Sequence, residues 1–114
     1  MYRTPSRHTP AFLLLFLADG PSYGALLLSR MQTELPFCLS DSAIVYRSLK
    51  QMEEQGLVDA EWRQEEPGQP RKWYVLNLKG KATLADYAED IRKRQANLDY
   101  FTKHYKAFEK KDRT

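Results

Sequence analysis

Several features are scarce in this 114-residue chain, and each scarcity excludes a class of protein. One cysteine, Cys38, leaves no partner for an internal disulfide, which fits a reducing compartment and predicts a cytoplasmic location. Two histidines, His8 and His104, stand far apart and give no metal-spaced set with that cysteine. The longest apolar run, Ala11 to Ala18, is far shorter than the roughly 20 residues of a membrane span. No small-residue cleavage site follows it, so no signal peptide is predicted.

Catalytic patterns are also missing. Serines and carboxylates are plentiful, but no motif orders them for nucleophilic or acid–base chemistry, so neither an enzyme nor a cofactor is expected. Cys38 has no second cysteine or obvious basic cluster beside it that lowers its pKa. It is therefore interpreted as a packed bystander, with a thiol sensor as the alternative.

Charge is small in total and uneven in its distribution. The formal net charge is +3, but residues 1–76 hold eight Lys/Arg and nine Asp/Glu, whereas residues 77–114 hold ten and six. The length and the 42% apolar content fit one small globular domain that benefits from an extra packing partner. Because the bulk charge of residues 1–76 is near neutral, any DNA-binding face there must come from local clustering of basic residues.

Two helices are predicted before residue 40. Residues 1–8, with Arg3 and Arg7, are expected to form a flexible polar arm. The first helix follows: Thr9 can cap it, and it runs to about Ala18. It is apolar nearly all round. Asp19-Gly20-Pro21 stops it. Ser22 can cap the second helix, which extends to about Glu34; Leu27 and Met31, four residues apart, are expected to face the core.

A third, amphipathic helix begins with a possible cap at Ser40. Its apolar stripe, Val45, Leu49 and Met52, ends at Gly56, which fits the left-handed position that closes helices, with Leu57 as its hydrophobic partner. The opposite face carries Ala43, Tyr46, Arg47, Lys50 and Gln51. A DNA major groove admits one helix, whose early residues reach the base edges. We therefore interpret Ser42, Tyr46, Arg47 and Lys50 as DNA-binding candidates; the alternative is an ordinary solvated face.

A basic-flanked hairpin follows this helix. Leu57 to Arg63 and Lys72 to Leu76 are rich in branched and aromatic residues and predict two strands, with Pro67-Gly68 turning the loop between them. Arg71 and Lys72 at the loop exit can reach DNA phosphates, which position a protein without reading sequence. Glu65 and Glu66 on the other side of the loop are expected either to point away from DNA or to limit non-specific binding. The alternative is a plain solvated hairpin.

Two tryptophans, Trp62 and Trp73, lie on these two strands. They are candidates for lining a flat aromatic pocket between the wing sheet and the long helix predicted below. The alternative interpretation is that they cover the base of the sheet.

The last predicted helix is long. Asn77 can cap it, and no proline occurs from Leu78 to Lys110. Its apolar residues follow a heptad, with a second row three residues later that Arg94 interrupts: Leu84, Ile91, Leu98 and Tyr105, then Tyr87, Phe101 and Phe108. Such a seam needs a partner, and the simplest partner is a second copy of the chain, so we expect a homodimer.

Combined, these motifs resemble the PadR family of bacterial transcriptional regulators. The resemblance rests on Tyr46-x-x-Leu49-x-x-Met52-x-x-x-Gly56-Leu57-Val58, on Pro70-Arg71-Lys72-x-Tyr74-x-Leu76, and on Leu17-Ala18-Asp19-Gly20-Pro21-x-x-Gly24. It implies a winged-helix dimer that represses nearby genes by binding an inverted repeat, and family members often respond to small aromatic effectors. The chain departs from the family pattern at Ala25, Met52 and Asn77, none of which removes the DNA-binding plan.

The predicted fold class is mainly α with a small two-stranded β wing: a winged helix-turn-helix plus a long C-terminal dimerisation helix. The expected organisation is an arm (1–8), a DNA-binding domain (9–76), a dimerisation helix (77–110) and a tail (111–114). The predicted function is repression through double-stranded DNA, with release by a small aromatic effector as an extension. The alternative is a winged-helix protein-interaction module without sequence-specific DNA binding.

Overall fold

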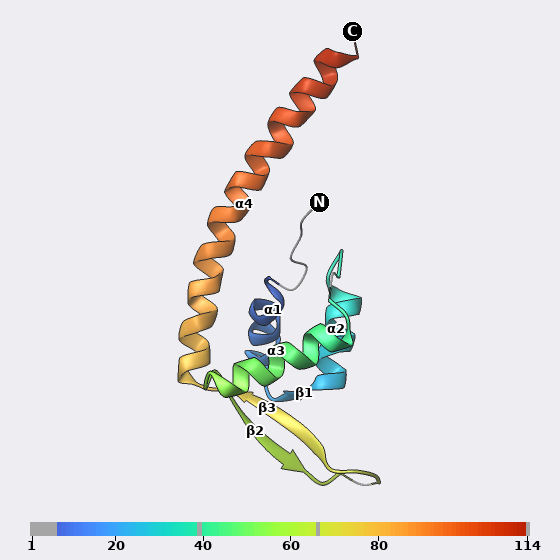
Figure 1. Cartoon of the computed structure of the whole chain (residues 1–114), viewed down its shortest axis with the longest axis vertical. Helices are drawn as coiled ribbons and strands as arrows, with labels where there is room; N and C mark the ends of the chain where they lie inside the picture. The colour runs from blue at the N-terminus through green and yellow to red at the C-terminus, as the bar shows by residue number, and fades with distance from the viewer. Residues whose placement is uncertain (1–6, 39, 66, 114) are drawn as a thin grey trace. The chain divides into compact units, whose positions relative to one another are not determined.

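The computed structural model describes residues 7–38, 40–65 and 67–113 (Figure 1). Arg3 of the predicted arm, Glu66 of the predicted loop and Thr114 of the predicted tail lie outside the described residues. The chain forms two compact units, residues 1–84 and 85–114, which are described separately. The elements in chain order are α1 (Thr9–Leu17), β1 (Ser22–Tyr23), α2 (Gly24–Glu34), α3 (Ser42–Glu54), β2 (Val58–Arg63), β3 (Arg71–Leu76) and α4 (Leu78–Asp112).

The core of the first unit forms where α1, α2 and α3 meet the sheet. Leu13 and Leu14 of α1 are completely buried, as expected for a helix that is apolar on nearly every side. Leu27 and Met31 of α2 face this core, as predicted. The stripe of α3 is buried with them, which confirms the period read from the sequence, and the buried apolar side chains of α3 are Val45, Leu49 and Met52.

The end of α3 fixes where the sheet begins. Gly56 has φ of +77°, and its amide donates to the carbonyl of Glu53, while the amide of Leu57 donates to Met52 at 2.9 Å. These two bonds satisfy carbonyls that the helix leaves free, and Leu57 folds back into the core. The predicted helix stop is therefore confirmed, and it directs the chain into β2.

Helix starts differ from the prediction in three places. Asp41, rather than Ser40, caps α3, because its Oδ1 accepts from the amide of Ile44 at 2.9 Å. The Ser40 and Thr9 hydroxyls instead form a buried hydrogen bond of 2.5 Å that joins α1 to the segment before α3. Thr9 is the first residue of α1 and makes no cap hydrogen bond, and Ser22 lies in a strand rather than at a helix cap.

The sheet has three antiparallel strands in the order β1-β3-β2. The two long strands, β2 and β3, form the predicted wing, and the register pairs Val58 with Leu76 and Arg63 with Arg71. The two-residue strand β1, not predicted from the sequence, pairs with the other edge of β3 (Figure 1). This third strand joins the start of α2 to the wing.

The first turns of α4 belong to the first unit. Asn77 caps the helix as predicted, because its Oδ1 accepts from the amide of Gly80 at 2.8 Å. The Asn77 side-chain amide also donates to the carbonyl of Gly56 at 2.9 Å, which links this cap to the end of α3. Gly80 is buried directly against the backbone of Leu57.

The second unit is the remainder of α4. Pairs one turn apart, Arg92 with Glu89 and Arg94 with Asp90, follow its surface. From Leu98 onward its large apolar side chains are exposed in the single chain, with Leu98 at 65% and Phe101 at 66%, whereas Tyr87 and Ile91 are half-buried. Among the helices of the described residues, none has the length and apolar character that a membrane crossing requires.

Candidate nucleic-acid interface

The exposed face of α3 carries the predicted DNA-binding residues. Ser42, Tyr46, Arg47 and Lys50 are all exposed, whereas the buried side chains of Val45 and Leu49 anchor the helix in the core. Neither Arg47 nor Lys50 forms an ion pair with any residue that the structure describes. Within the described part of the chain, these two cations one turn apart therefore have no ion-pair partner, which leaves them available to an external anion.

Tyr46 is held against the start of α2. A Cβ atom built on Gly24 would lie only 2.2 Å from Cε1 of Tyr46, so the absence of a side chain at Gly24 makes room for the ring. Tyr46 remains 46% exposed, and its hydroxyl stays near the surface. Gly24 therefore sets where the tyrosine of α3 lies, a contact between residues 22 positions apart that sequence periodicity does not report.

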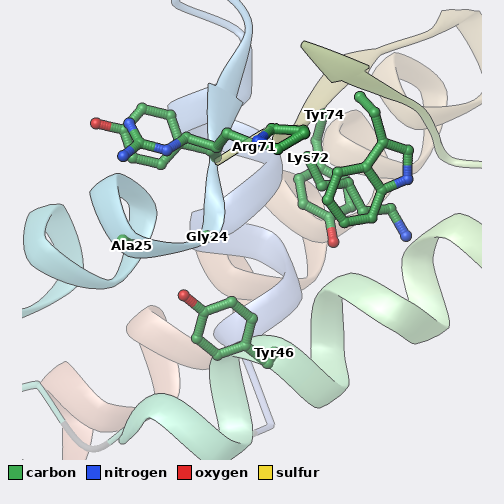
Figure 2. A pocket seen from close by; sticks show the side chains of 9 residues that line it. Gly24, Ala25, Tyr46, Arg71, Lys72 and Tyr74 are labelled. Atoms are coloured by element: carbon green, nitrogen blue, oxygen red, sulfur yellow. The ribbon is translucent and has the colours of Figure 1, made fainter. Parts of the chain in front are cut away.

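A groove of about 350 Å³ opens between α3, the start of α2 and the wing (Figure 2). Figure 2 shows Tyr46 on one side of it and Arg71, Lys72 and Tyr74 on the other. Its lining combines aromatic rings with two cations, a mixture that suits a flat or anionic ligand. The residues that line it are Tyr23, Gly24, Ala25, Tyr46, Trp62, Pro70, Arg71, Lys72 and Tyr74.

Lys72 does not project freely from the wing. Its Nζ donates to Oε1 of Glu53 on α3 at 2.8 Å and lies 5.6 Å from the centre of the Tyr74 ring. The hydrogen bond to Glu53 raises the pKa of Lys72 above its usual 10.5. Lys72 therefore joins the wing to the helix, and a phosphate that reaches it must compete with Glu53.

Arg71 is also oriented by neighbours. Its Nη1 lies 3.3 Å from Oε1 of Glu65, and its guanidinium carbon lies 4.0 Å from the centre of the Tyr23 ring. The stacking fixes the plane of a guanidinium that is otherwise exposed. Glu65 on the other side of the loop thus forms an ion pair with one of the predicted DNA-binding cations. Part of the positive charge predicted for the wing is therefore balanced internally.

Tyr74 anchors the wing in the core. Burial raises the pKa of its phenol above the usual 10.0, with nearby Lys72 acting in the opposite direction. Because Tyr74 is opposite Ala60 and beside Ser22 in the register, it holds the centre of the sheet. The wing is therefore a fixed extension of the first unit at this point.

The two tryptophans do not come together. The register pairs Trp62 with Lys72 and Trp73 with Glu61, and paired residues share a face of the sheet whereas neighbours alternate. Trp62 and Trp73 therefore lie on opposite faces, and only Trp62 lines the groove. The predicted aromatic pocket that both would line is not formed.

The remaining candidates stay outside this surface. Cys38 is half-buried, and its Sγ donates to the carbonyl of Ser40 at 3.2 Å. Among residues 7–38, 40–65 and 67–113, no three metal-ligating side chains gather. The sequence reasoning missed Gly24, Glu53 and Tyr23, which position Tyr46, Lys72 and Arg71 respectively. The only sequence signal for any of them was Gly24 within the family-like motif.

Comparisons with known proteins agree with this geometry. Residues 13–86 match the family described as the transcriptional regulator PadR-like family. No curated protein sequence matches the chain.

Solved structures share the fold. A PadR family transcription regulator from Clostridium difficile superposes with a TM-score of 0.72 at 22% identity, covering 82% of this chain and 97% of that one. A putative transcriptional regulator from Thermoplasma acidophilum gives 0.73 at 26% identity, with 82% and 89% covered. Bacillus subtilis PadR in complex with operator DNA gives 0.67 at 24% identity, covering 72% of this chain and 47% of that one.

Proposed function

Because this chain belongs to the transcriptional regulator PadR-like family, we propose that it is a regulator that binds double-stranded operator DNA through α3 and the wing. The family consists of transcriptional regulators rather than enzymes, and the chain shares its winged-helix fold. The observation that carries the proposal is the pair Arg47 and Lys50, exposed on a helix whose opposite face is buried. The operator complex of the Bacillus subtilis relative supports it.

The chemistry of the surface divides the contacts into two kinds. Arg47 is suited to the bidentate acceptor pair of guanine or to a phosphate, whereas Lys50 and the Tyr46 hydroxyl are suited to phosphates. Ser42 lies in the first turn of α3, where a helix presents unpaired N–H groups to an anion. Arg71 and Lys72 would reach the backbone beside the groove, with Lys72 exchanging its bond to Glu53 for one to phosphate.

A homodimer is the second part of the proposal. Two α3 helices can occupy successive major grooves about 34 Å apart when two-fold symmetry matches an inverted repeat. The heptad seam of α4, whose C-terminal half is exposed in the single chain, would pack against the same seam of a second copy. Its members are Leu84, Tyr87, Ile91, Leu98, Phe101, Tyr105 and Phe108.

The dimer is tested by sedimentation. Leu98→Glu places a charge in the seam and should shift the protein toward the monomer, whereas Ala96→Glu, two residues earlier and off the seam, should leave the dimer intact. A wild-type protein that sediments as a monomer refutes this part of the proposal.

Repression, a cytoplasmic location and release by a small aromatic effector complete the proposal. The effector would need a binding site other than a pocket lined by both tryptophans, which lie on opposite faces of the sheet. It must also bind one of two dimer geometries more tightly than the other, because only differential affinity shifts such an equilibrium.

Selection from a random DNA pool tests the function itself. The wild-type protein should enrich an inverted repeat and bind it more tightly than shuffled DNA of the same composition. Arg47→Ala and Lys50→Ala should weaken binding, while Lys93→Ala on α4, which removes one exposed cation elsewhere, should have little effect. No preference for any fragment over shuffled DNA would favour the protein-interaction module instead.

A further inference from the structure

The wing carries a tryptophan that the core does not use. Trp62 is 68% exposed and lies on β2 opposite Lys72. Exposure of one apolar residue is ordinary and by itself indicates nothing. The residues around Trp62 indicate a role, because Trp62 lines the same groove as Tyr46 of α3 and the cations Arg71 and Lys72.

The register explains why Trp62 lies there. Residues 58, 60 and 62 of β2 alternate onto one face of the sheet, and Val58 on that face is buried against the core. Trp62 continues this face past the end of the core, where helices no longer cover it. Its backbone is therefore held in a paired strand rather than in a loop, so the position from which the ring projects is fixed before any ligand arrives.

Building on the proposed function, we propose that Trp62 contacts the sugar–phosphate backbone of the DNA beside the groove that α3 enters. An indole combines an apolar ring, which packs on a deoxyribose, with one N–H that donates to a phosphate oxygen. Lys72, the cross-strand partner of Trp62 on the same face of the sheet, supplies positive charge of the sign that a phosphate requires. Arg71 belongs to the opposite face by register but also lines the groove. The surface is also continuous with Tyr46 on α3, so one backbone strand contacts both elements.

The contact offsets the internal pairing of the two wing cations, which limits what they can contribute to DNA binding. Both wing cations are partly satisfied internally, Lys72 by Glu53 and Arg71 by Glu65. An apolar surface loses no internal partner when DNA covers it, so Trp62 contributes without first breaking an ion pair. The contact is to the backbone, and therefore it affects affinity but not the choice of sequence.

The second tryptophan provides a matched internal control. Trp73 is half-buried on the opposite face of the sheet, with the Tyr23 ring at 5.0 Å edge-on and the Arg63 guanidinium 4.5 Å from its own ring centre. These two are the only tryptophans in the chain. Fluorescence from each can therefore be isolated by changing the other to phenylalanine.

The experiment titrates the selected DNA fragment into Trp73→Phe and Trp62→Phe proteins. In Trp73→Phe, the emission of Trp62 should change on DNA binding, and its quenching by acrylamide should fall several-fold. In Trp62→Phe, the emission of Trp73 should stay nearly constant. Trp62→Ala should weaken binding roughly three- to tenfold, the scale of one lost hydrogen bond, and by the same factor for operator and shuffled DNA.

The outcomes separate this inference from the proposed function. DNA binding with unchanged Trp62 emission and acrylamide access overturns the inference and leaves the function standing. Failure of the wild-type protein to bind any fragment defeats both. A third outcome is that the Trp62 emission responds to dilution of the protein or to a small aromatic compound while DNA leaves it unchanged. Either result assigns the ring to another partner and also overturns the inference. If Trp73→Phe does not fold, fluorotryptophan in the unchanged chain gives the same readout by ¹⁹F resonance shifts.

Discussion

Gly80 offers a sharp test of the packing that joins α4 to the first unit. A Cβ atom added at Gly80 would lie 2.1 Å from the carbonyl oxygen of Leu57 and 2.6 Å from a methyl carbon of Leu76. The first neighbour is backbone and lies next to the Schellman-type end of α3, so it cannot rotate out of the way. Gly80→Ala must therefore move α4 away from the sheet or distort the α3–β2 junction.

Two opposing effects set the magnitude. Alanine in a helix is favoured over glycine by about 1 kcal/mol, so an unobstructed site would become more stable. Here the carbon must retreat by about 1.3 Å, the difference between 2.1 Å and the 3.4 Å at which ordinary contact begins. Overpacking of this kind costs roughly 1–3 kcal/mol and more where backbone must shift. We expect net destabilisation of about 1–2 kcal/mol, since the steric cost exceeds the gain in propensity.

Urea unfolding followed by circular dichroism measures this change. Gly80→Ala should lower the free energy of unfolding, whereas Lys81→Ala, the same product residue at the next and exposed position, should change it little. A Gly80→Ala protein as stable as wild type, or more stable, would show that α4 does not approach Leu57 so closely and would refute the argument.

Two further predictions follow from the site. Gly24→Ala should displace the Tyr46 ring, whose outer atoms lie within 3.0 Å of the added carbon. DNA binding should weaken by more than the unfolding free energy falls, because an exposed side chain can move cheaply; equal effects on binding and stability would contradict the argument. In the Tyr46→Phe protein, which has already lost the hydroxyl, Gly24→Ala should weaken binding less. Burial raises the pKa of Tyr74, and the bond to Glu53 raises that of Lys72, so both groups hold their protons more strongly in the folded chain. Their stabilising contribution is complete below the unfolded pKa values, 10.0 for Tyr74 and 10.5 for Lys72, and it is lost as pH rises through the folded pKa values. Tyr74→Phe should therefore flatten the fall of the unfolding free energy at alkaline pH. An unchanged slope of unfolding free energy against pH would contradict burial of the phenol.

The fold was largely predictable because local signals agreed with each other. The buried stripe of α3, its glycine stop and the cap of α4 at Asn77 each rest on periodicity and backbone preference within a few residues. The strand β1 was missed because two residues, Ser22 and Tyr23, are too few to show alternation. The cap of α3 shifted to Asp41 because Ser40 has a buried partner that is 31 residues away.

The exposure of the candidate residues on α3 was predictable, but the partners of the wing residues were not. Residues on the exposed face of α3 followed from the helical period, whereas the environment of each wing residue depends on strand register. The sequence does not state that register, so a pocket lined by both Trp62 and Trp73 remained one of two interpretations, although the two residues occupy opposite faces. Likewise, the ion pair of Lys72 with Glu53 joins two elements across 19 residues, and no local pattern reports it.

The central claim is that the exposed face of α3 neutralises DNA phosphates, and salt dependence of binding tests it most directly. Each phosphate contact removed should lower the slope of log affinity against log salt by about 0.9. Lys50→Ala should therefore reduce the wild-type slope by about one and Lys93→Ala should not, in anisotropy titrations on the selected operator. Equal slopes for the wild-type and Lys50→Ala proteins, or a slope that only Lys93→Ala reduces, would place the DNA elsewhere and contradict the account.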